Sequence, residues 1–305
     1  MTDEVLLAAR GIRRTYGART ALHGLDLELK RGDVLGFLGQ NGAGKSTTLQ
    51  ILAGALAPSA GEILVCGHSL TRAPAAAKAR LGFLPEQPPL YRDLRVDDYL
   101  AGCARLRGVA RAAVPAAVAR ARAHCGLEAV GARVIGHLSK GYQQRVGIAQ
   151  ALVHDPAVVI LDEPTSGLDP AQIREVRALI AELGRERAVI VSTHILPEVR
   201  ALATRLLVLH QGRVVHDGRV TASARLRARL RRPPPAAALA ALPGVSAVEQ
   251  TEAGWLLATA TPEDSAEALV AAAAAGDWGL IELDPADDDL ERLFLAVTGQ
   301  RARAA

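Results

Sequence analysis

The chain has 305 residues, a formal net charge of +4 at pH 7, a hydrophobic content of 50% and an aromatic content of 3%. This length suits one large or two ordinary domains with an aliphatic core, and the mild positive charge is weak evidence for a nucleic-acid partner. The three cysteines lack C-x-x-C spacing, which argues against a zinc site, and no apolar run reaches the roughly 18 residues typical of a membrane-spanning helix.

The first thirty residues carry the patterns of strands and hairpins. Residues 5–9 are apolar, and residues 25–29 alternate between leucine and acidic residues, which is typical of a half-buried strand. Tyr16 stands between these two patterns, where a strand ends at a turn. Its position leaves two interpretations open: ordinary packing, and a ring that stacks on a nucleotide base, since a phosphate-binding loop follows.

Residues 39–47 read Gly-Gln-Asn-Gly-Ala-Gly-Lys-Ser-Thr and match the G-x-x-x-x-G-K-[ST] pattern of a phosphate-binding loop. An apolar run over 33–38 predicts a buried strand before the loop, and the spacing over 46–52 predicts a helix after it. The glycines allow the backbone to wrap closely around phosphates, and a helix N-terminus favours anions. Lys45 is expected to reach the β- and γ-phosphates, and the Ser46 hydroxyl to bind Mg²⁺. The predicted contacts to a nucleoside triphosphate come from Gly39, Asn41, Gly42, Ala43, Gly44, Lys45, Ser46 and Thr47.

The following elements alternate between strands and helices. A turn and a strand are predicted over 57–65, and a further strand over 81–87 ends in Gln87. After a strand of a nucleotide-binding core, a glutamine is able to accept a hydrogen bond from a metal-bound water. Residues 96–134 are rich in alanine and arginine, with Pro115 near a helix start, and predict a small helical subdomain.

Residues 138–145 open another helix. Ser139 and Gly141 suit its N-terminal cap, and apolar residues at helical spacing follow. Two interpretations are open for this segment: a well-capped core helix, and a second anion site at the helix N-terminus.

An apolar strand over 157–163 ends in two acidic residues. Such a run is typical of a central parallel strand, and two carboxylates at its end are costly unless they bind something. Asp162 suits Mg²⁺, directly or through water, and Glu163 suits a general base that polarises an attacking water. A second apolar strand over 188–194 ends in His194, which is either a structural residue or a contact to the γ-phosphate.

Residues 166–170 predict a tight turn before a helix, and strands over 206–209 and 213–216 follow further along the chain. The alternation of strands and helices predicts a mostly parallel sheet with helices packed on it. We therefore expect an α/β domain over residues 1–220.

Beyond residue 220 the composition changes. Arginine-rich residues and three prolines predict a basic helix and a stiff linker over 221–236. Residues 237–305 predict a small α+β accessory domain, and the run Asp287–Asp289 would suit either a metal or a helix start. The expected elements of this domain are a hairpin about 253–254, a helix over 262–275, a strand over 279–283 and a final helix over 288–298.

In this order the motifs make residues 6–217 resemble the ATP-binding subunit of an ABC transporter. The resemblance identifies residues 39–47 as a Walker A loop, 138–143 as a signature motif and 158–162 as a Walker B strand. Further ATP contacts are implied for Tyr16, Ser139, Gly141, Gln143 and Asp169, the last in a D-loop over 166–169. Catalytic roles are implied for Lys45, Gln87, Glu163 and His194, and Mg²⁺ contacts for Ser46, Gln87 and Asp162.

The signature departs from the common Leu-Ser-Gly-Gly-Gln form, because Lys140 replaces a glycine and Tyr142 replaces the glutamine. This signature, Leu84–Tyr91 and Ser192–Glu198 are similar to the ABC-2 subgroup, in particular to gliding-motility-associated and multidrug-type ATPases. The implied fold is α/β: a P-loop NTPase core of the ABC ATPase type with antiparallel β and helical subdomains, plus the small C-terminal α+β domain.

The resemblance also implies partners. Two such domains, expected as a homodimer, sandwich two ATP molecules head to tail, and a separate ABC-2 type transmembrane permease converts their motion into export. The chain is then cytoplasmic, peripheral at the inner face of the membrane through the permease only, and without a nucleic-acid partner. The alternative is a soluble ABC ATPase that acts on ribosomes or DNA. A single phosphate loop and the absence of sustained heptads between Gln87 and the signature fit that alternative poorly.

Overall fold

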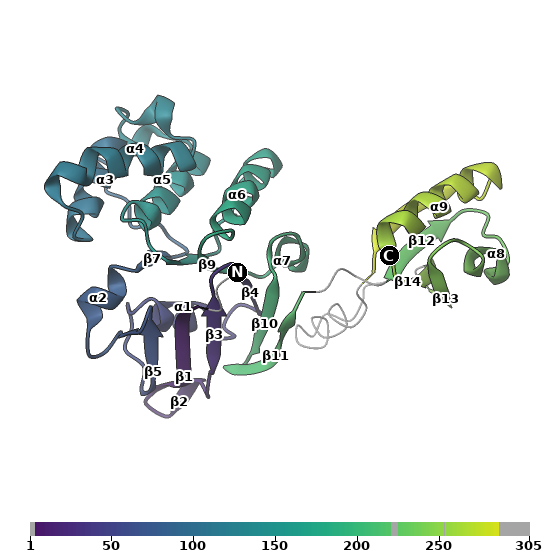
Figure 1. Cartoon of the computed structure of the whole chain (residues 1–305), viewed down its shortest axis with the longest axis horizontal. Coiled ribbons are helices and arrows are strands. Elements are labelled where there is room, and N and C mark those ends of the chain that lie inside the picture. The colour runs from purple at the N-terminus through teal and green to yellow at the C-terminus, as the bar shows by residue number, and fades with distance from the viewer. Residues whose placement is uncertain (1–3, 221–224, 253, 287–305) are drawn as a thin grey trace. The chain divides into compact units, whose positions relative to one another are not determined.

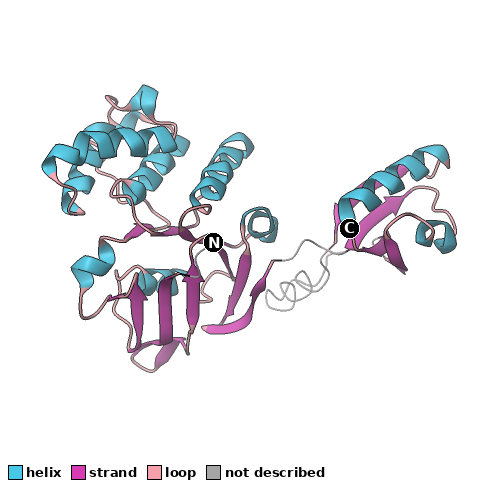
Figure 2. Cartoon of the chain, in the orientation of Figure 1, coloured by secondary structure: helices cyan, strands magenta, loops and turns pink. Residues whose placement is uncertain are grey.

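The computed structural model describes residues 4–220, 225–252 and 254–286, and the chain divides into two compact units (Figure 1). Unit 1 spans residues 1–220 and unit 2 spans residues 221–305. Each unit has its own apolar core and is described by itself. Figure 2 shows that both units combine helices and strands.

The larger sheet of unit 1 consists of β4 (Val34–Leu38), β7 (Leu81–Leu84), β8 (Val158–Asp162), β9 (Ala188–Thr193), β10 (Arg205–His210) and β11 (Arg213–Arg219). Their order is β11-β10-β4-β9-β8-β7, and only β10 and β11 are antiparallel neighbours. Every residue of β4, β8 and β9 is buried, as expected for parallel strands covered on both faces. The prediction of a mostly parallel sheet is therefore confirmed.

The second sheet of unit 1 is antiparallel and consists of β1 (Val5–Tyr16), β2 (Arg19–Leu22), β3 (Leu27–Lys30), β5 (Ala60–Val65) and β6 (His68–Ser69). Helix α1 (Lys45–Leu52) follows β4 and packs in a core shared by both sheets. Leu49 of α1, Leu7 of β1 and Phe37 of β4 are fully buried members of that core. This packing fixes the N-terminal end of α1, where the phosphate loop lies.

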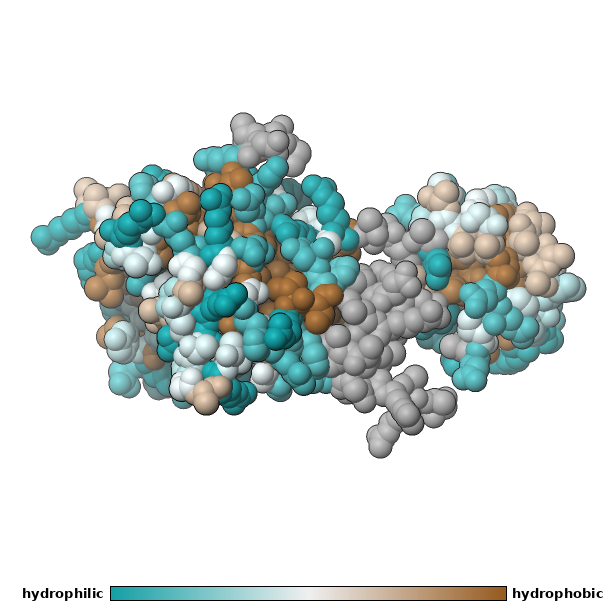
Figure 3. Space-filling view, turned by 90° about the horizontal axis from the view of Figure 1, so that it is seen from below, coloured by the Kyte–Doolittle hydropathy of each residue, from teal (hydrophilic) through white to brown (hydrophobic). Residues whose placement is uncertain are grey.

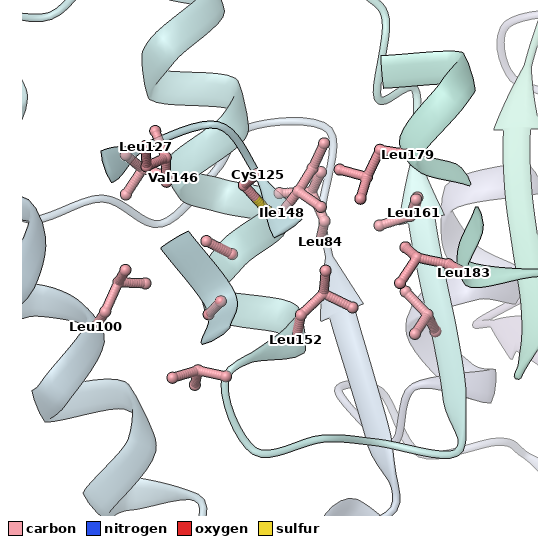
Figure 4. Packing of buried hydrophobic residues seen from close by; sticks show 14 of the residues in the cluster. Leu84, Leu100, Cys125, Leu127, Val146, Ile148, Leu152, Leu161, Leu179 and Leu183 are labelled. Atoms are coloured by element: carbon pink, nitrogen blue, oxygen red, sulfur yellow. The ribbon is translucent and has the colours of Figure 1, made fainter. Parts of the chain in front are cut away.

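The remaining helices of unit 1 are α2 (Pro74–Lys78), α3 (Val96–Leu106), α4 (Val114–His124), α5 (Lys140–Leu152), α6 (Pro170–Leu183) and α7 (Leu196–Leu202), with 3-10 turns at Arg111–Ala113, Glu128–Val130 and Ile135–His137. Figure 1 shows α3, α4 and α5 grouped together, as the predicted helical subdomain requires. Leu100 of α3, Ile148 and Leu152 of α5, Leu84 of β7 and Leu161 of β8 belong to one apolar cluster (Figure 4). The cluster joins the helical subdomain to the parallel sheet.

Helix α5 and the turn that follows it supply hydrogen-bond donors to the outer carbonyls of β7, the last strand in the sheet order. Gln150 Nε2 donates to the Phe83 carbonyl at 2.8 Å, and His154 Nε2 lies 3.1 Å from the Leu81 carbonyl. Burial, together with the charge of Arg107, lowers the pKa of His154 to about 4. The neutral imidazole therefore donates to Leu81, and the edge carbonyls of β7 are not left open to another strand.

Unit 2 consists of β12 (Arg225–Leu230), α8 (Ala236–Ala240), β13 (Val245–Thr251), β14 (Gly254–Thr259), α9 (Pro262–Ala275) and β15 (Leu280–Pro285). The order of its antiparallel sheet is β13-β14-β12-β15, so these elements form the β-α-β-β-α-β arrangement of ferredoxin-like domains. The helix predicted over 288–298 and the run Asp287–Asp289 lie outside the described residues.

The basic helix predicted within 221–236 is wrong, because Arg225–Leu230 forms β12, a central strand of unit 2. The run alternates Arg-Leu-Arg-Ala-Arg-Leu, and this period of two is the pattern of a strand. Leu226, Ala228 and Leu230 are buried in the core of unit 2. The core supplies the free energy that favours the strand over a helix.

No helix in the described ranges has both the length and the hydropathy needed to cross a membrane. Figure 3 shows one face of the molecule, on which hydrophilic residues predominate and hydrophobic residues gather in smaller patches. A polar site lies at the edge of the parallel sheet of unit 1.

Candidate nucleotide-binding and hydrolysis site

A pocket of about 1010 Å³ opens over the phosphate loop of unit 1. It lies where the buried strands β4, β8 and β9 end, so the loops that follow these strands converge on it. The predicted site residues that line it are Tyr16, Asn41, Gly42, Gly44, Lys45, Ser46, Thr47, Glu163 and His194.

The loop adopts a conformation that requires glycine at its end. Gly44 has φ of +103°, and a Cβ atom placed there would lie 2.8 Å from the Ala21 carbonyl oxygen. Both the left-handed backbone and the close approach exclude larger residues. Gly39 and Ala43 belong to the same loop but do not line the pocket. The turn of the β10–β11 hairpin braces the loop, because Gly212 N–H donates to the Ala43 carbonyl at 2.9 Å.

Lys45 is the buried cation of the pocket, with 6% of the residue exposed. Its Nζ donates to the carbonyls of Gly39 at 2.6 Å and Gln40 at 3.3 Å. Burial lowers the pKa of Lys45, and the charges of Glu163, Asp162 and Glu86 oppose that shift. The ammonium group is thus held among carboxylates at the start of a helix, a position suited to phosphate oxygens.

Glu163 and His194 form a pair at the ends of β8 and β9. His194 Nδ1 lies 3.0 Å from Oε1 and 3.1 Å from Oε2 of Glu163. Burial raises the pKa of Glu163, while the hydrogen bond and charge of His194 and the charge of Lys45 lower it. A carboxylate in this setting can take a proton from a water that attacks a phosphate.

The backbone at Glu163 is in the left-handed region, with φ of +48°. For a residue other than glycine this costs about 1–3 kcal/mol and persists only where the surroundings impose it. Glu163 N–H donates to Ser192 Oγ at 2.9 Å, and the Ser192 hydroxyl donates to Asp162 Oδ1. Asp162 is 2% exposed and does not line the pocket, although its charge acts on Lys45.

Gln87 lies outside the lining of this pocket. Strand β7 ends at Leu84, and Gln87 lines a neighbouring pocket of about 580 Å³. Glu86 lines both pockets. The sequence reasoning missed Glu86, although its signal was present: an acidic residue shortly after a buried parallel strand, next to the glutamine that drew attention. The role predicted for Gln87 stays a prediction.

The signature residues cap α5 rather than line the pocket over the phosphate loop. Ser139 is the N-cap residue, and its Oγ accepts from Tyr142 N–H at 3.4 Å. Gly141 is buried, and Gln143 Nε2 donates to the Leu138 carbonyl at 2.9 Å. The prediction of a capped helix is confirmed, and the anion site at its N-terminus stays a prediction.

The signature lies next to the D-loop of the same chain. Asp169 caps α6 by accepting from Ala171 N–H at 3.0 Å and Gln172 N–H at 2.9 Å. A Cβ atom placed on Gly167 would lie 1.9 Å from Lys140 Nζ, so the lysine that departs from the common signature covers the D-loop. The structure thus brings the signature and D-loop together, and of their residues only Ser166 lines the pocket that contains Lys45.

Tyr16 is 46% exposed and lines the pocket, so it is not a core residue. The Arg14 guanidinium carbon lies 4.4 Å from the centre of its ring, which gives a cation–π contact. The exposed ring favours the stacking interpretation over ordinary packing. Sequence reasoning missed other lining residues, such as His23, whose N–H donates to the Gly212 carbonyl at 2.9 Å.

Comparisons with known proteins agree with this geometry. Residues 22–166 match the family model described as ABC transporter. The "Uncharacterized ABC transporter ATP-binding protein YhcH" of Bacillus subtilis (strain 168) is 38% identical over 219 residues, which cover 70% of this chain and 69% of that protein. The "Bacitracin transport ATP-binding protein BcrA" of Bacillus licheniformis is 34% identical over 214 residues, with 70% and 69% covered.

A solved structure described as "Structure of ATP binding subunit of ABC transporter" has a TM-score of 0.65 and 30% identity. The similarity covers 70% of this chain and 90% of that one. The fold, the pocket over the phosphate loop and these relatives lead to one conclusion. The chain belongs to the family of ABC transporter ATP-binding proteins and is an ABC ATPase.

Proposed function

We propose that this chain hydrolyses ATP to drive export of a substrate through a separate membrane permease of the ABC-2 type. The observation that carries the hydrolytic part is the Glu163–His194 pair beside Lys45 in the pocket over the phosphate loop. Transport is supported by the names of the bacitracin transport protein and of a "Lantibiotic transport ATP-binding protein SrtF" of Streptococcus pyogenes, 32% identical. Export is supported by the name of a "Nod factor export ATP-binding protein I" of Paraburkholderia xenovorans (strain LB400), 37% identical. The substrate of this chain is not identified by these names.

The residues at the pocket fit a magnesium ion bound with ATP. Ser46 lines the pocket, and the carboxylates of Asp162 and Glu86 act on Lys45 from close by. Hydroxyl and carboxylate oxygens together with phosphate oxygens are the donors that Mg²⁺ prefers. When bound, the ion would neutralise charge on the phosphates. In this proposal Ser46 and Asp162 hold the ion, while Gln87 is a predicted contact.

The chain's own residues account for the proton transfer. Glu163 accepts a proton from the attacking water, and His194 holds the carboxylate in place through Nδ1. Lys45 stabilises negative charge on the β- and γ-phosphates. Tyr16 stacks on the adenine ring.

We further propose that two copies act as a pair, head to tail. Ser139, Gly141, Gln143 and Asp169 do not line the pocket that contains Lys45, so in this arrangement they contact ATP held by the other copy. The N-terminus of α5 then serves as the second anion site. The pair lies at the cytoplasmic face of the membrane, attached through the permease.

The experiment that tests this function is affinity purification of the tagged chain from native membranes solubilised in detergent, followed by mass spectrometry. Recovery of a polytopic membrane protein supports the exporter. Recovery of ribosomal or DNA-repair proteins without a membrane protein would overturn it in favour of a soluble ABC ATPase. The Lys45→Ala variant is the matched control, because it retains the surface of the chain and loses the buried ammonium.

A further inference from the structure

Glu198 is a buried carboxylate outside the nucleotide pocket. It lies in the first turn of α7 and is 4% exposed. Its Oε2 accepts hydrogen bonds from the hydroxyls of Thr165 and Thr193, each at 2.9 Å, and its Oε1 lies 3.7 Å from Arg177 Nη2. Because a buried carboxylate is costly unless it is hydrogen-bonded or paired, these contacts favour one arrangement of the segments that supply them.

The two threonines stand next to the proposed catalytic pair. Thr165 follows Glu163 by two residues in the loop after β8, and Thr193 directly precedes His194 at the end of β9. The Thr193 hydroxyl oxygen also accepts from Ile195 N–H at 3.1 Å. This local hydrogen bond spans His194 and stabilises the turn in which it lies. Glu198 therefore contacts both loops beside the pair without entering the pocket.

The backbone at Glu163 adds a second reason to expect an effect on function. Its left-handed conformation is fixed on one side by the hydrogen bond from Glu163 N–H to Ser192 Oγ. On the other side, the bond from Thr165 to Glu198 fixes the chain two residues later. Loss of Glu198 would remove this side-chain restraint and leave only backbone hydrogen bonds on that side, such as the one from Ser166 N–H to the Glu163 carbonyl at 3.1 Å.

We propose that Glu198 is a positioning residue for ATP hydrolysis. By holding Thr165 and Thr193 together, it keeps Glu163 and His194 within hydrogen-bond distance and sets the path of the D-loop, which starts at Ser166. The inference rests on the catalytic role proposed for Glu163. It assigns a buried carboxylate to the reaction through other residues, not through contact with ATP.

The test compares ATP turnover and ATP binding of the full chain in Glu198→Ala and Glu198→Gln variants. Glu198→Ala is expected to lower kcat by roughly 10- to 100-fold, since small displacements of catalytic groups have effects of this size, with ATP affinity unchanged. Glu198→Gln is expected to regain part of the loss, because its amide oxygen still accepts from both hydroxyls. The control is Glu182→Ala, which removes a half-exposed carboxylate of α6.

A second measurement distinguishes positioning from general loss of stability. In a Glu163→Gln background, Glu198→Ala is expected to cause no further loss of turnover, because the group it positions is already absent. Thr165→Val and Thr193→Val each remove one hydroxyl and are expected to lower kcat in the wild type. Thr165→Val is expected to cause no further loss in the Glu198→Ala background, whereas Thr193→Val also removes the acceptor of Ile195 N–H. These threonine variants carry the test if Glu198→Ala does not fold.

Two results would overturn the inference. One is wild-type kcat in Glu198→Ala; the other is an equal loss of turnover with and without Glu163. Wild-type turnover in Glu163→Gln would instead remove the proposed base, and with it the premise. Because the two variants are measured separately, failure of the positioning role and failure of the proposed function are distinguishable.

Discussion

The Nζ atom of Lys45 lies 4.0 Å from Oε1 of Glu163, so the cation proposed for the phosphates and the base proposed for the water share one buried site. The two groups come from α1 and from the end of β8, far apart in the sequence. Lys45 is proposed to act in ATP binding and Glu163 in ATP turnover. Substitutions of each residue can separate the two effects.

Lys45→Ala is expected to weaken ATP binding by roughly 10- to 100-fold, because it removes charged hydrogen bonds worth about 1.5–3 kcal/mol. A fluorescence or calorimetric titration with ATP measures the change. Lys78→Ala is the matched control, since Lys78 lies on α2 and does not line the pocket. Unchanged affinity in Lys45→Ala would show that the ammonium does not contact the phosphates.

Glu163→Gln is expected to retain ATP affinity and to lose more than about 100-fold in turnover, the range for a positioned general base. The amide retains the shape of the side chain and can still accept from His194, but it cannot take a proton from water. Phosphate release under saturating ATP measures the loss. A variant with wild-type turnover would assign the base elsewhere.

Glu86 and Gln87 are neighbours that the structure separates, since only Glu86 lines the pocket with Lys45. We expect Glu86→Ala to lower turnover by about 10-fold or more, the range for loss of one electrostatic contribution at a reacting site, and Gln87→Ala to have the smaller effect. The reason is that the charge of Glu86 opposes the fall in the pKa of Lys45 and so favours the ammonium form that faces the phosphates. Parallel ATPase measurements on the two variants decide between them. A larger loss in Gln87→Ala would favour the role predicted from the sequence.

His154 makes the stability of unit 1 sensitive to mild acid. Burial lowers its pKa from 6.5 to about 4, so the folded chain stays neutral at His154 while the unfolded chain takes up a proton below pH 6.5. The free energy of unfolding therefore falls as the pH drops from 6.5 toward 4, by on the order of 2 kcal/mol near pH 5.

Urea unfolding at neutral pH and near pH 5, compared between wild type and His154→Gln, measures this contribution of His154 to the free energy of unfolding. The variant is expected to be less stable than wild type at neutral pH. Its free energy of unfolding is expected to fall less than that of wild type when the pH is lowered to 5. His68→Gln, at an exposed histidine of β6, controls for the substitution itself. An identical acid response in wild type and His154→Gln would contradict the prediction.

The sequence predicted the site where local patterns are strong. Residues 158–162 form a continuous apolar run that has the features of a central parallel strand, and the phosphate loop follows another such strand. The position of Glu86 after a buried parallel strand is a sequence signal for a site residue, but which of Glu86 and Gln87 lines the pocket with Lys45 depends on the path of the chain after β7. The helix predicted at β12 is wrong because the arginine content of this segment does not determine its structure, whereas the alternation of arginine with buried residues indicates a strand.

The turn of the hairpin β10–β11 is connected to the phosphate loop by a backbone hydrogen bond. The bond joins Gly212 to Ala43, and β11 is the strand by which the chain leaves unit 1. A pulling force applied to the chain beyond Arg219 would therefore act along β11 toward a turn that touches the phosphate loop. Force along β11 would therefore reach the backbone of the phosphate loop through the hydrogen bond between Gly212 N–H and the Ala43 carbonyl.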